Sequence, residues 1–395
     1  MKKLVARNCM LLWLMLLALG PSAAAQVIPI SNVEELYSAV NNPDNAGATL
    51  ALAAGTYTLS ATDPTGAPRP KGGRIELQRD MSLVGVEGDR TLVVITAFNL
   101  PASSFPQTAG PNAAIRMGLG HNAIEWLTVR DARFAQANID SGLQPLDAEP
   151  AFVWIAHIAS TGSVRGLNLL NFGPQTSGQV LEADIIDSYF FENPFSVSEG
   201  MRIGNFQGAR GCVINVRMSG NRAWGQKQGR LIVNNRALES TVNVFSSGNR
   251  FYNNGAGTLL IGGLSSNNNR ADGNTINFEA HGDQFIGNAA ATEFDHGGIV
   301  ALGLENISGT TGGGSNNAVN IKLWGCRMLE NAVWDLAGIG ARSFPELTAS
   351  LSQNNRVTIE IHGAGQRNGA WQPVEFFAHS LPAVPNDGNS VTVIR

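Results

Sequence analysis

The sequence predicts an all-β chain wound as a right-handed parallel β-helix, and two interleaved phrases carry this prediction. The first phrase occurs five times, with a polar residue between two apolar ones and a glycine five positions after the polar residue. Alternation at period two indicates strands with the apolar side chains inward and the Asn or Thr outward. Repetition at such intervals indicates a solenoid. The copies begin at Ile214, Val242, Ile276, Val319 and Val357, at spacings of 28, 34, 43 and 38 residues.

The second phrase is a short apolar run that alternates along the chain with the first. Each coil is therefore expected to hold at least two strands. Gly- and Asn-rich segments such as 248–254 and 325–331 separate them, and both residue types tolerate left-handed backbone at corners. Stacked Asn side chains are expected to form ladders from coil to coil. The copies of the second phrase are Met201–Ile203, Leu231–Val233, Leu259–Ile261, Val300–Leu302 and Leu336–Gly338.

Residues 1–25 have the pattern of a secretory signal peptide. Lys2, Lys3 and Arg7 precede an apolar run over 10–19, and Ala23–Ala25 supply a small-residue cleavage site. The run is too short to span a membrane comfortably, so a retained anchor is the less favoured alternative. We expect a secreted or periplasmic protein with no membrane span after signal removal.

Residues 26–47 are predicted to form an N-terminal cap. Ser31–Glu34 matches a capping box, Leu36 and Val40 share one helical face, and Pro43 ends the pattern. A short helix over 32–40 would plug the open end of the solenoid, whose terminal strands would otherwise pair with another molecule.

Residues 48–59 alternate in hydropathy and contain the turn Gly55-Thr56-Tyr57. This segment resembles the first coil of the pectin-lyase-like superfamily of right-handed β-helices. The resemblance implies the handedness of the coil and a solenoid over 48–363. Its motifs are specific for the fold and do not select an activity.

The motifs of two enzyme families within that superfamily are not matched. Trp154-Ile155-Ala156-His157 is similar to the Trp-Ile-Asp-His motif of pectate lyases, but Ala156 stands where that family has Asp. The Asn-Thr-Asp, Asp-Asp, Gly-His-Gly and Arg-Ile-Lys motifs of polygalacturonases are absent from the sequence. Both families are therefore disfavoured.

The charge composition argues against some classes of binding partner. The formal net charge is −4, and Lys71, Lys227 and Lys322 are the lysines after the signal segment. Nucleic acid and anionic membranes are therefore poor candidates. Cys212 and Cys326 occupy different places in the repeat, several coils apart, which argues against an internal disulfide.

The C-terminal segment 364–395 loses the repeat and is predicted to pack along the side of the solenoid. The outward positions expected for the second phrase are mostly apolar, so that sheet should not face water. Either this tail or another subunit is expected to cover it, which leaves a homo-oligomer open. These positions are Arg202, Ile232, Leu260, Ala301 and Ala337.

The densest charges lie between residues 182 and 236, and they supply the leading catalytic candidates. A polysaccharide lyase neutralises a uronate carboxylate with Ca²⁺ or Arg and removes the neighbouring proton with a base. The candidates for these roles are Lys227, Arg222 and Arg230 together with Asp184 and Asp187, and ordinary surface ion pairs are the competing interpretation. Asp184 and Asp187 would also be the best pair for glycoside hydrolysis.

Further candidates for substrate binding are Glu192, Arg202, His281, Asp283, Glu293, Asp295 and His296. The last five offer acid, base and metal ligands, although no recognised metal spacing identifies an ion, so the metal stays unknown and Ca²⁺ possible. In contrast, the outward row Arg217, Phe245, Glu279, Lys322 and Glu360 on the first sheet is expected to be scaffold with paired charges.

The sequence thus favours an exported β-helix protein that binds or processes an acidic extracellular polysaccharide, by β-elimination if it is an enzyme. The competing class is a non-catalytic surface protein that binds glycan or partner subunits through its flat sheets.

Overall fold

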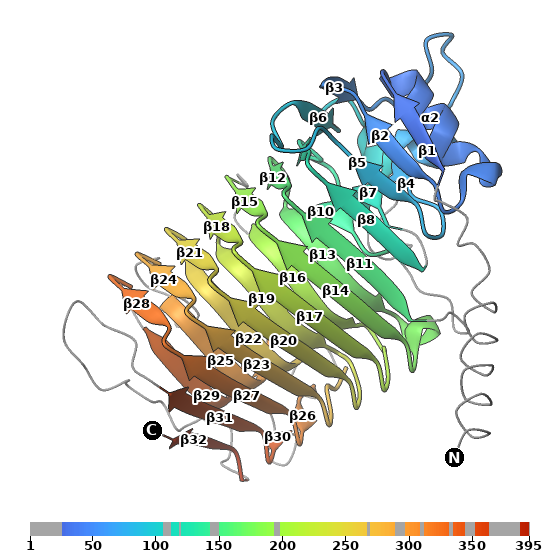
Figure 1. Ribbon diagram of the computed structural model, residues 1–395. Helices are drawn as coiled ribbons and strands as arrows, with labels where there is room; N and C mark the ends of the chain where they lie inside the picture. The colour runs from blue at the N-terminus through green and yellow to red at the C-terminus, as the bar shows by residue number, and fades with distance from the viewer. Residues whose placement is uncertain are drawn as a thin grey trace, which may run out of the picture.

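The computed structural model describes residues 26–394 with ten internal gaps, and it shows a stack of coils made of three parallel sheets. In Figure 1 the coils run from the blue N-terminal end to the red C-terminal end. The gaps are 106–111, 118–119, 143–149, 193–197, 267–268, 289–296, 309–311, 332–334, 344–351 and 363–387. The all-β solenoid predicted from the repeats is confirmed.

Sheet 1 has twelve strands. They are β1 (Val27–Ile30), β2 (Thr49–Leu52), β5 (Ser82–Val84), β8 (His121–Glu125), β11 (Ala151–Ala156), β14 (Val180–Ile186), β17 (Val213–Ser219), β20 (Thr241–Ser247), β23 (Thr275–His281), β27 (Ala318–Trp324), β31 (Arg356–His362) and β32 (Ser390–Ile394). All five copies of the first phrase lie here in one register, with Ile214 beside Val242 and Val242 beside Ile276.

Sheet 2 has nine short strands that the sequence did not reveal. They are β3 (Gly55–Thr58), β6 (Val93–Thr96), β9 (Thr128–Arg130), β12 (Ala159–Thr161), β15 (Tyr189–Phe191), β18 (Arg222–Trp224), β21 (Arg250–Tyr252), β24 (Gln284–Ile286) and β28 (Arg327–Leu329). Most have three residues, too few for a period of two to be visible, and the segments that hold β21 and β28 were interpreted as turns.

Sheet 3 also has nine strands and contains the second phrase. They are β4 (Ile75–Glu76), β7 (Ala113–Arg116), β10 (Ala137–Asp140), β13 (Arg165–Phe172), β16 (Glu199–Phe206), β19 (Gln228–Asn235), β22 (Ala256–Ser265), β25 (Gly297–Asn306) and β29 (Leu336–Ser343). A separate small sheet pairs β26 (Gly314–Ser315) with β30 (Ser352–Gln353).

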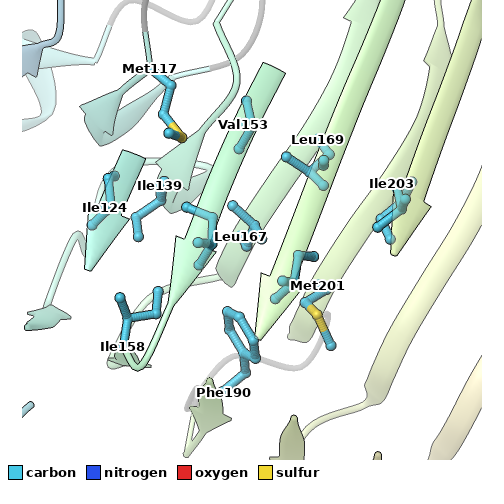
Figure 2. Close-up of a cluster of buried hydrophobic side chains, with 14 of the residues drawn as sticks. Met117, Ile124, Ile139, Val153, Ile158, Leu167, Leu169, Phe190, Met201 and Ile203 are labelled. Carbon is cyan, nitrogen blue, oxygen red and sulfur yellow. The ribbon is translucent and has the colours of Figure 1, made fainter. Parts of the chain in front are cut away.

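The interior between the three sheets is one continuous hydrophobic core. Figure 2 shows part of it, where Ile124, Val153, Leu167 and Met201 from different strands lie among one another. Each coil contributes a few apolar side chains that pack against those of the next coil. The core therefore runs along the length of the solenoid. Cys212 and Cys326 are buried and unbridged, as predicted.

The exterior of sheet 3 carries a second apolar cluster. Its members show that the prediction of which residues face outward was partly wrong. Arg202 pairs in register with Leu231 and not with Ile232. Ile232, Leu260 and Ala301 therefore face the core, whereas Leu231, Leu259 and Val300 face outward. The outward face is apolar, as expected, but through these other residues. The cluster is buried and comprises Leu170, Phe206, Leu231, Val233, Ala256, Leu259, Ile261, Val300, Leu302, Ala337 and Ile339.

Amide ladders hold the corners of the coils. Asn254, Asn288 and Asn331 form one ladder between sheets 2 and 3, with amide contacts of 3.0–3.1 Å. Another joins Asn274, Asn317, Asn355 and Asn389 between sheets 3 and 1, at 2.9–3.0 Å. These side chains are buried, and each also satisfies a backbone group of a neighbouring coil, which a buried corner requires.

The N-terminal end is closed by helix α2 (Val33–Asn41), close to the predicted 32–40. Leu36 and Val40 are buried, as expected. The cap is shifted by one residue, because Asn32 accepts from the Glu35 amide at 3.0 Å while Glu35 accepts from the Ser31 amide at 2.7 Å. Figure 1 shows α2 across the end of the stack.

Several expectations fall on residues outside the described part of the chain. These are the signal segment 1–25, the candidates Glu293, Asp295 and His296, and most of the tail, 363–387. The last residues of the tail, Ser390–Ile394, form the strand β32, which continues sheet 1 beside β31. No helix in the described residues is long and apolar enough to cross a membrane.

Candidate functional site

The outward face of sheet 1 contains a groove of about 530 Å³, and its lining residues come from the five successive strands β14, β17, β20, β23 and β27. Its floor is the amide row, defined here as Asn215, Asn243, Asn277 and Asn320, one residue per coil. Successive amides donate to one another at 2.7, 2.8 and 2.9 Å. Period two places the row outward because Val, Ile and Phe on either side of each Asn point into the core. The predicted orientation of these residues is confirmed.

Charged side chains of both signs flank the amide row. Arg217 binds Asp184 through two contacts of 2.7 and 3.0 Å, and Glu182 accepts from Asn215 at 2.7 Å. The hydrogen bonds with Asp184 raise the pKa of Arg217. Lys322 lies 3.6 Å from Glu360, which confirms one predicted pair. The groove therefore has no strong excess of either charge.

Aromatic rings border the groove toward the carboxyl ends of the strands. Phe245 and Trp324 are 45% and 41% exposed, values that are high for such large apolar side chains. Trp324 stacks on His362 with 3.9 Å between ring centroids, and His281 lies 5.8 Å away on its other side. His281, a predicted substrate-binding residue, also contacts Glu279 at 2.7 Å. It thus belongs to the border of the groove.

A second cluster occupies the corner between sheets 1 and 2 in earlier coils. Nδ1 of His157 lies 3.0 Å from Oδ2 of Asp187, and the His157 ring stacks on Trp126 at 3.9 Å. Arg90 binds the same Asp187 oxygen at 2.5 Å and lies 3.9 Å from the centroid of Tyr189. Burial raises the pKa of Asp187, but the bonds from His157 and Arg90 outweigh it and hold that pKa below its usual value.

The backbone at this corner is strained where the cluster lies. Later coils place Gly220, Gly248, Gly282 and Gly325 there with φ of 59 to 68°. In the earlier coils the equivalent residues are Trp126, His157 and Asp187, with φ of 56, 55 and 40°. Left-handed backbone costs a residue with a side chain ~1–3 kcal/mol, and such strain gathers at functional sites. Asp187 was a candidate from sequence, whereas the spacing did not connect His157 to it.

The predicted basic site is not assembled. Arg230 is fully buried in the core, where Thr258 and Ser246 accept from its guanidinium at 3.0 and 2.9 Å. Arg222 instead lies exposed on the outer face of sheet 2, and Lys227 lies in the turn before β19. Strand alternation separates these residues, because Arg222 points outward and Arg230 inward. Arg230 therefore has no access to a polysaccharide outside the solenoid.

The remaining sequence candidates are also dispersed. Asp283 is buried beside Arg230, with 3.8 Å between Oδ2 and Nη2. Glu192 is exposed at the end of β15, while Arg202 on sheet 3 binds Glu199 at 2.6 Å. Asp184 pairs with Arg217 of the groove, and Asp187 belongs to the corner cluster. Within the described residues no group of three or more His, Cys, Asp or Glu side chains is placed to hold a metal ion.

Comparison with solved structures finds β-helix proteins at low similarity. No protein-family model and no curated protein sequence matches the chain. The A-module of mannuronan C-5 epimerase AlgE4 from Azotobacter vinelandii is 15% identical, with a TM-score of 0.41 over 90% of this chain and 100% of that one. Pectate lyase Pel9A is 14% identical, with a TM-score of 0.39 over 84% and 79%. The GH87 α-1,3-glucanase of Streptomyces thermodiastaticus is 13% identical, with a TM-score of 0.38 over 95% and 68%.

The amide row was visible in the sequence, but the groove was not. Sequence alternation placed Arg217, Phe245 and Glu279 outward, and the structure confirms this. Their row was expected to be scaffold because its charges alternate in sign. The signal that could have identified a site is the large exposed aromatic Phe245 within an otherwise polar outward row.

Proposed function

We propose that this chain is an exported protein that binds an extended polysaccharide in the sheet 1 groove. The amide row supports the proposal most directly. Asn243 and Asn277 each donate one N–H to the previous amide and accept one from the next, and Asn215 donates to Glu182. Each amide therefore keeps a second N–H and oxygen lone pairs for a ligand. One such group per coil suits a polymer that presents hydroxyl groups at regular intervals.

The border of the groove suits the same class of ligand. Sugar rings have apolar faces and polar edges, so a site that binds them combines exposed aromatic surface with hydrogen-bonding groups. Phe245 supplies the exposed aromatic surface beside the amide row. The Asp184–Arg217 pair closes one end and offers donors and acceptors that are already oriented.

Binding to immobilised polysaccharides tests this proposal. Purified protein without residues 1–25 would be titrated by calorimetry and affinity electrophoresis against polygalacturonate, alginate, chondroitin, dextran and cellulose. Phe245→Ala is expected to weaken binding to the preferred polymer at least tenfold. Phe134→Ala is the matched control, since Phe134 is 52% exposed outside the groove. Equal affinities of both variants and the wild type would exclude the groove.

A second candidate function is polysaccharide processing, favoured by the strained His157–Asp187 pair. Asp187 orients the imidazole through Nδ1, so that Nε2 is the nitrogen that would accept a proton. In β-elimination the base removes the proton α to a uronate carboxyl, the C4–O bond breaks, and the leaving oxygen takes a proton from water. The new double bond absorbs ultraviolet light.

Absorbance of unsaturated uronates, measured with polygalacturonate, alginate and glycosaminoglycans with and without Ca²⁺, tests this second function. An increase that His157→Gln abolishes, while Phe134→Ala retains it, would support His157 as the base. No increase and no new reducing ends with any polymer would leave binding as the function.

A further inference from the structure

The outer face of sheet 2 carries a row of arginines that the groove does not use. The register places Tyr189, Arg222, Arg250, Gln284 and Arg327 side by side on successive strands. All three arginines are exposed. Figure 1 shows their strands β18, β21, β24 and β28 as a line of short arrows along one edge of the stack. We call Arg222, Arg250 and Arg327 the arginine row.

The arginine row lacks carboxylate partners within the described residues, as do Arg133, Arg236 and Arg356, whereas several other arginines are paired. Arg69, Arg90, Arg210, Arg217 and Arg270 each bind an Asp or Glu within 3.0 Å. In the described residues no ion pair involves Arg222, Arg250 or Arg327. Like charges directly opposite on neighbouring strands repel, and Arg222 stands directly beside Arg250. A row of this kind is unfavourable for the isolated protein, and a bound polyanion would relieve the repulsion.

The next outward row on sheet 2 is a stack of aromatic rings beside the arginine row. Phe191, Trp224 and Tyr252 stack in sequence, with ring centroids 4.5 and 5.4 Å apart and interplanar angles of 4 and 9°. Arg222 also lies over the Tyr189 ring, 5.2 Å from its centroid. Burial raises the pKa of Tyr252, and the positive charges of Arg222 and Arg250 oppose that rise. Both guanidiniums are therefore near the aromatic stack.

Arg222 and Arg250 lie on adjacent coils, and Gln284 on β24 separates Arg250 from Arg327. Neighbouring strands lie ~4.8 Å apart, which is close to the length of one sugar ring. A uronate polymer carries one carboxylate per ring, and Arg binds carboxylate and sulfate groups with two parallel hydrogen bonds. Asp283 directly precedes β24 but is buried beside Arg230, and Asp187 precedes β15 and is bound to Arg90. Glu192 and Glu330 follow β15 and β28, at the ends opposite to the arginine row. The row itself therefore stays basic.

We propose that the arginine row binds an anionic polysaccharide and is a second contact surface, separate from the sheet 1 groove. This inference relies on the proposed function for the kind of polymer, and it adds the charge class that the groove does not specify. Single-stranded nucleic acid would also satisfy arginines and aromatic rings. The stacked rings present their edges outward, however, so their faces are not open to bases.

Two triple variants test the inference. Arg222→Gln, Arg250→Gln and Arg327→Gln together remove the row. Arg210→Gln, Arg236→Gln and Arg270→Gln remove the same charge at the corner between sheets 3 and 1, and serve as the matched control. Binding to polygalacturonate and dextran sulfate would be measured between 50 and 500 mM NaCl, together with dextran and oligo(dT), since surface charge contacts weaken as ~0.1 M salt screens them.

The first triple variant is expected to bind both anionic polymers at least tenfold more weakly and with a flatter salt dependence, while the control triple variant stays near wild type. Equal loss in both triple variants would show an effect of net charge alone and overturn the proposal, as would unchanged binding. Tighter binding of oligo(dT) than of either anionic polysaccharide would overturn the ligand class. Phe245→Ala in the same assay reports on the groove separately, so failure of one surface does not imply failure of the other.

Discussion

Arg230 and Asp283 form an ion pair in the interior of the solenoid, with 3.8 Å between Nη2 and Oδ2 and no exposure of either side chain. The Arg230 guanidinium also lies 4.5 and 4.7 Å from the ring centroids of Phe251 and Phe278. Burial lowers the pKa of Arg230 to about 10, and the Asp283 charge opposes this. The pair belongs to the interior of the solenoid and lies outside any surface site.

Asp283→Ala should therefore be strongly destabilising, because it leaves a buried guanidinium without its counter-charge. Breaking such a pair costs ~3–5 kcal/mol. Urea unfolding followed by circular dichroism measures the loss. Glu239→Ala breaks the exposed pair with Arg210 and is the control, expected to leave the midpoint unchanged.

The double variant Arg230→Met and Asp283→Asn should recover most of that stability. Asp283 accepts from Asn249 at 2.8 Å, a contact that an amide oxygen can also make, and Met fills the space of the aliphatic stem. A double variant as unstable as Asp283→Ala would show that the fold needs the charges themselves.

Substitution by Leu should affect stability differently at two asparagines that are three residues apart. Asn274 is buried in the corner ladder and donates to Ala237 O at 2.8 Å, so Asn274→Leu leaves buried polar groups unpaired and should cost ~2 kcal/mol or more. Asn277 is exposed in the amide row, so Asn277→Leu should preserve the unfolding midpoint and weaken polysaccharide binding. Equal destabilisation would contradict the assignment of the faces.

Asp140 should make the protein less stable at neutral pH than in mild acid. It is fully buried, with Arg116 Nε 3.6 Å from its Oδ1, and burial raises its pKa to about 6 from the ordinary value of 3.8. The folded state therefore holds a proton that the unfolded state releases, and the stability gained below pH 4 is lost as the pH rises through 6. The difference between the two pKa values of Asp140 corresponds to ~3 kcal/mol of unfolding free energy at most.

Denaturant unfolding of the wild type and of Asp140→Asn, measured at pH 4, 5, 6 and 7.5, tests this contribution. The variant should gain stability relative to the wild type as the pH rises, with the change centred near pH 5. Parallel profiles for the two proteins would refute it.

The apolar exterior of sheet 3 leads to a prediction about removal of the C-terminal tail. Leu231, Leu259 and Val300 face outward and are buried, and the tail is proposed to cover them. Removing 364–395 should cause aggregation and binding of a hydrophobic dye. Removing 390–395 alone deletes β32 but keeps Asn389 of the corner ladder, and serves as the control. A longer truncation that is as soluble and as dye-free as the shorter one would assign the cover to another part of the chain or to a second subunit.

The sequence alone determined the architecture, because a solenoid repeats its local chemistry in every coil. The period-two phrases defined the strands of sheets 1 and 3, and the Asn-rich corners predicted the ladders, since these contacts join equivalent positions of adjacent repeats. Alternation predicted which face of sheet 1 points outward. A polar residue recurs at the same position of the phrase, as Asn277 does, so the outward face was clear. In sheet 3 both faces are apolar, so alternation could not decide between Leu231 and Ile232.

The tertiary structure decided which charged residues meet. Arg222 and Arg230 are eight residues apart but lie on opposite sides of the coil wall, whereas His157 and Asp187 are thirty residues apart and in contact. Sequence distance within a coil is a poor guide to proximity, because each coil turns through three sheets before equivalent positions stack. The groove and the arginine row are properties of that stacking, which brings one side chain per coil into line.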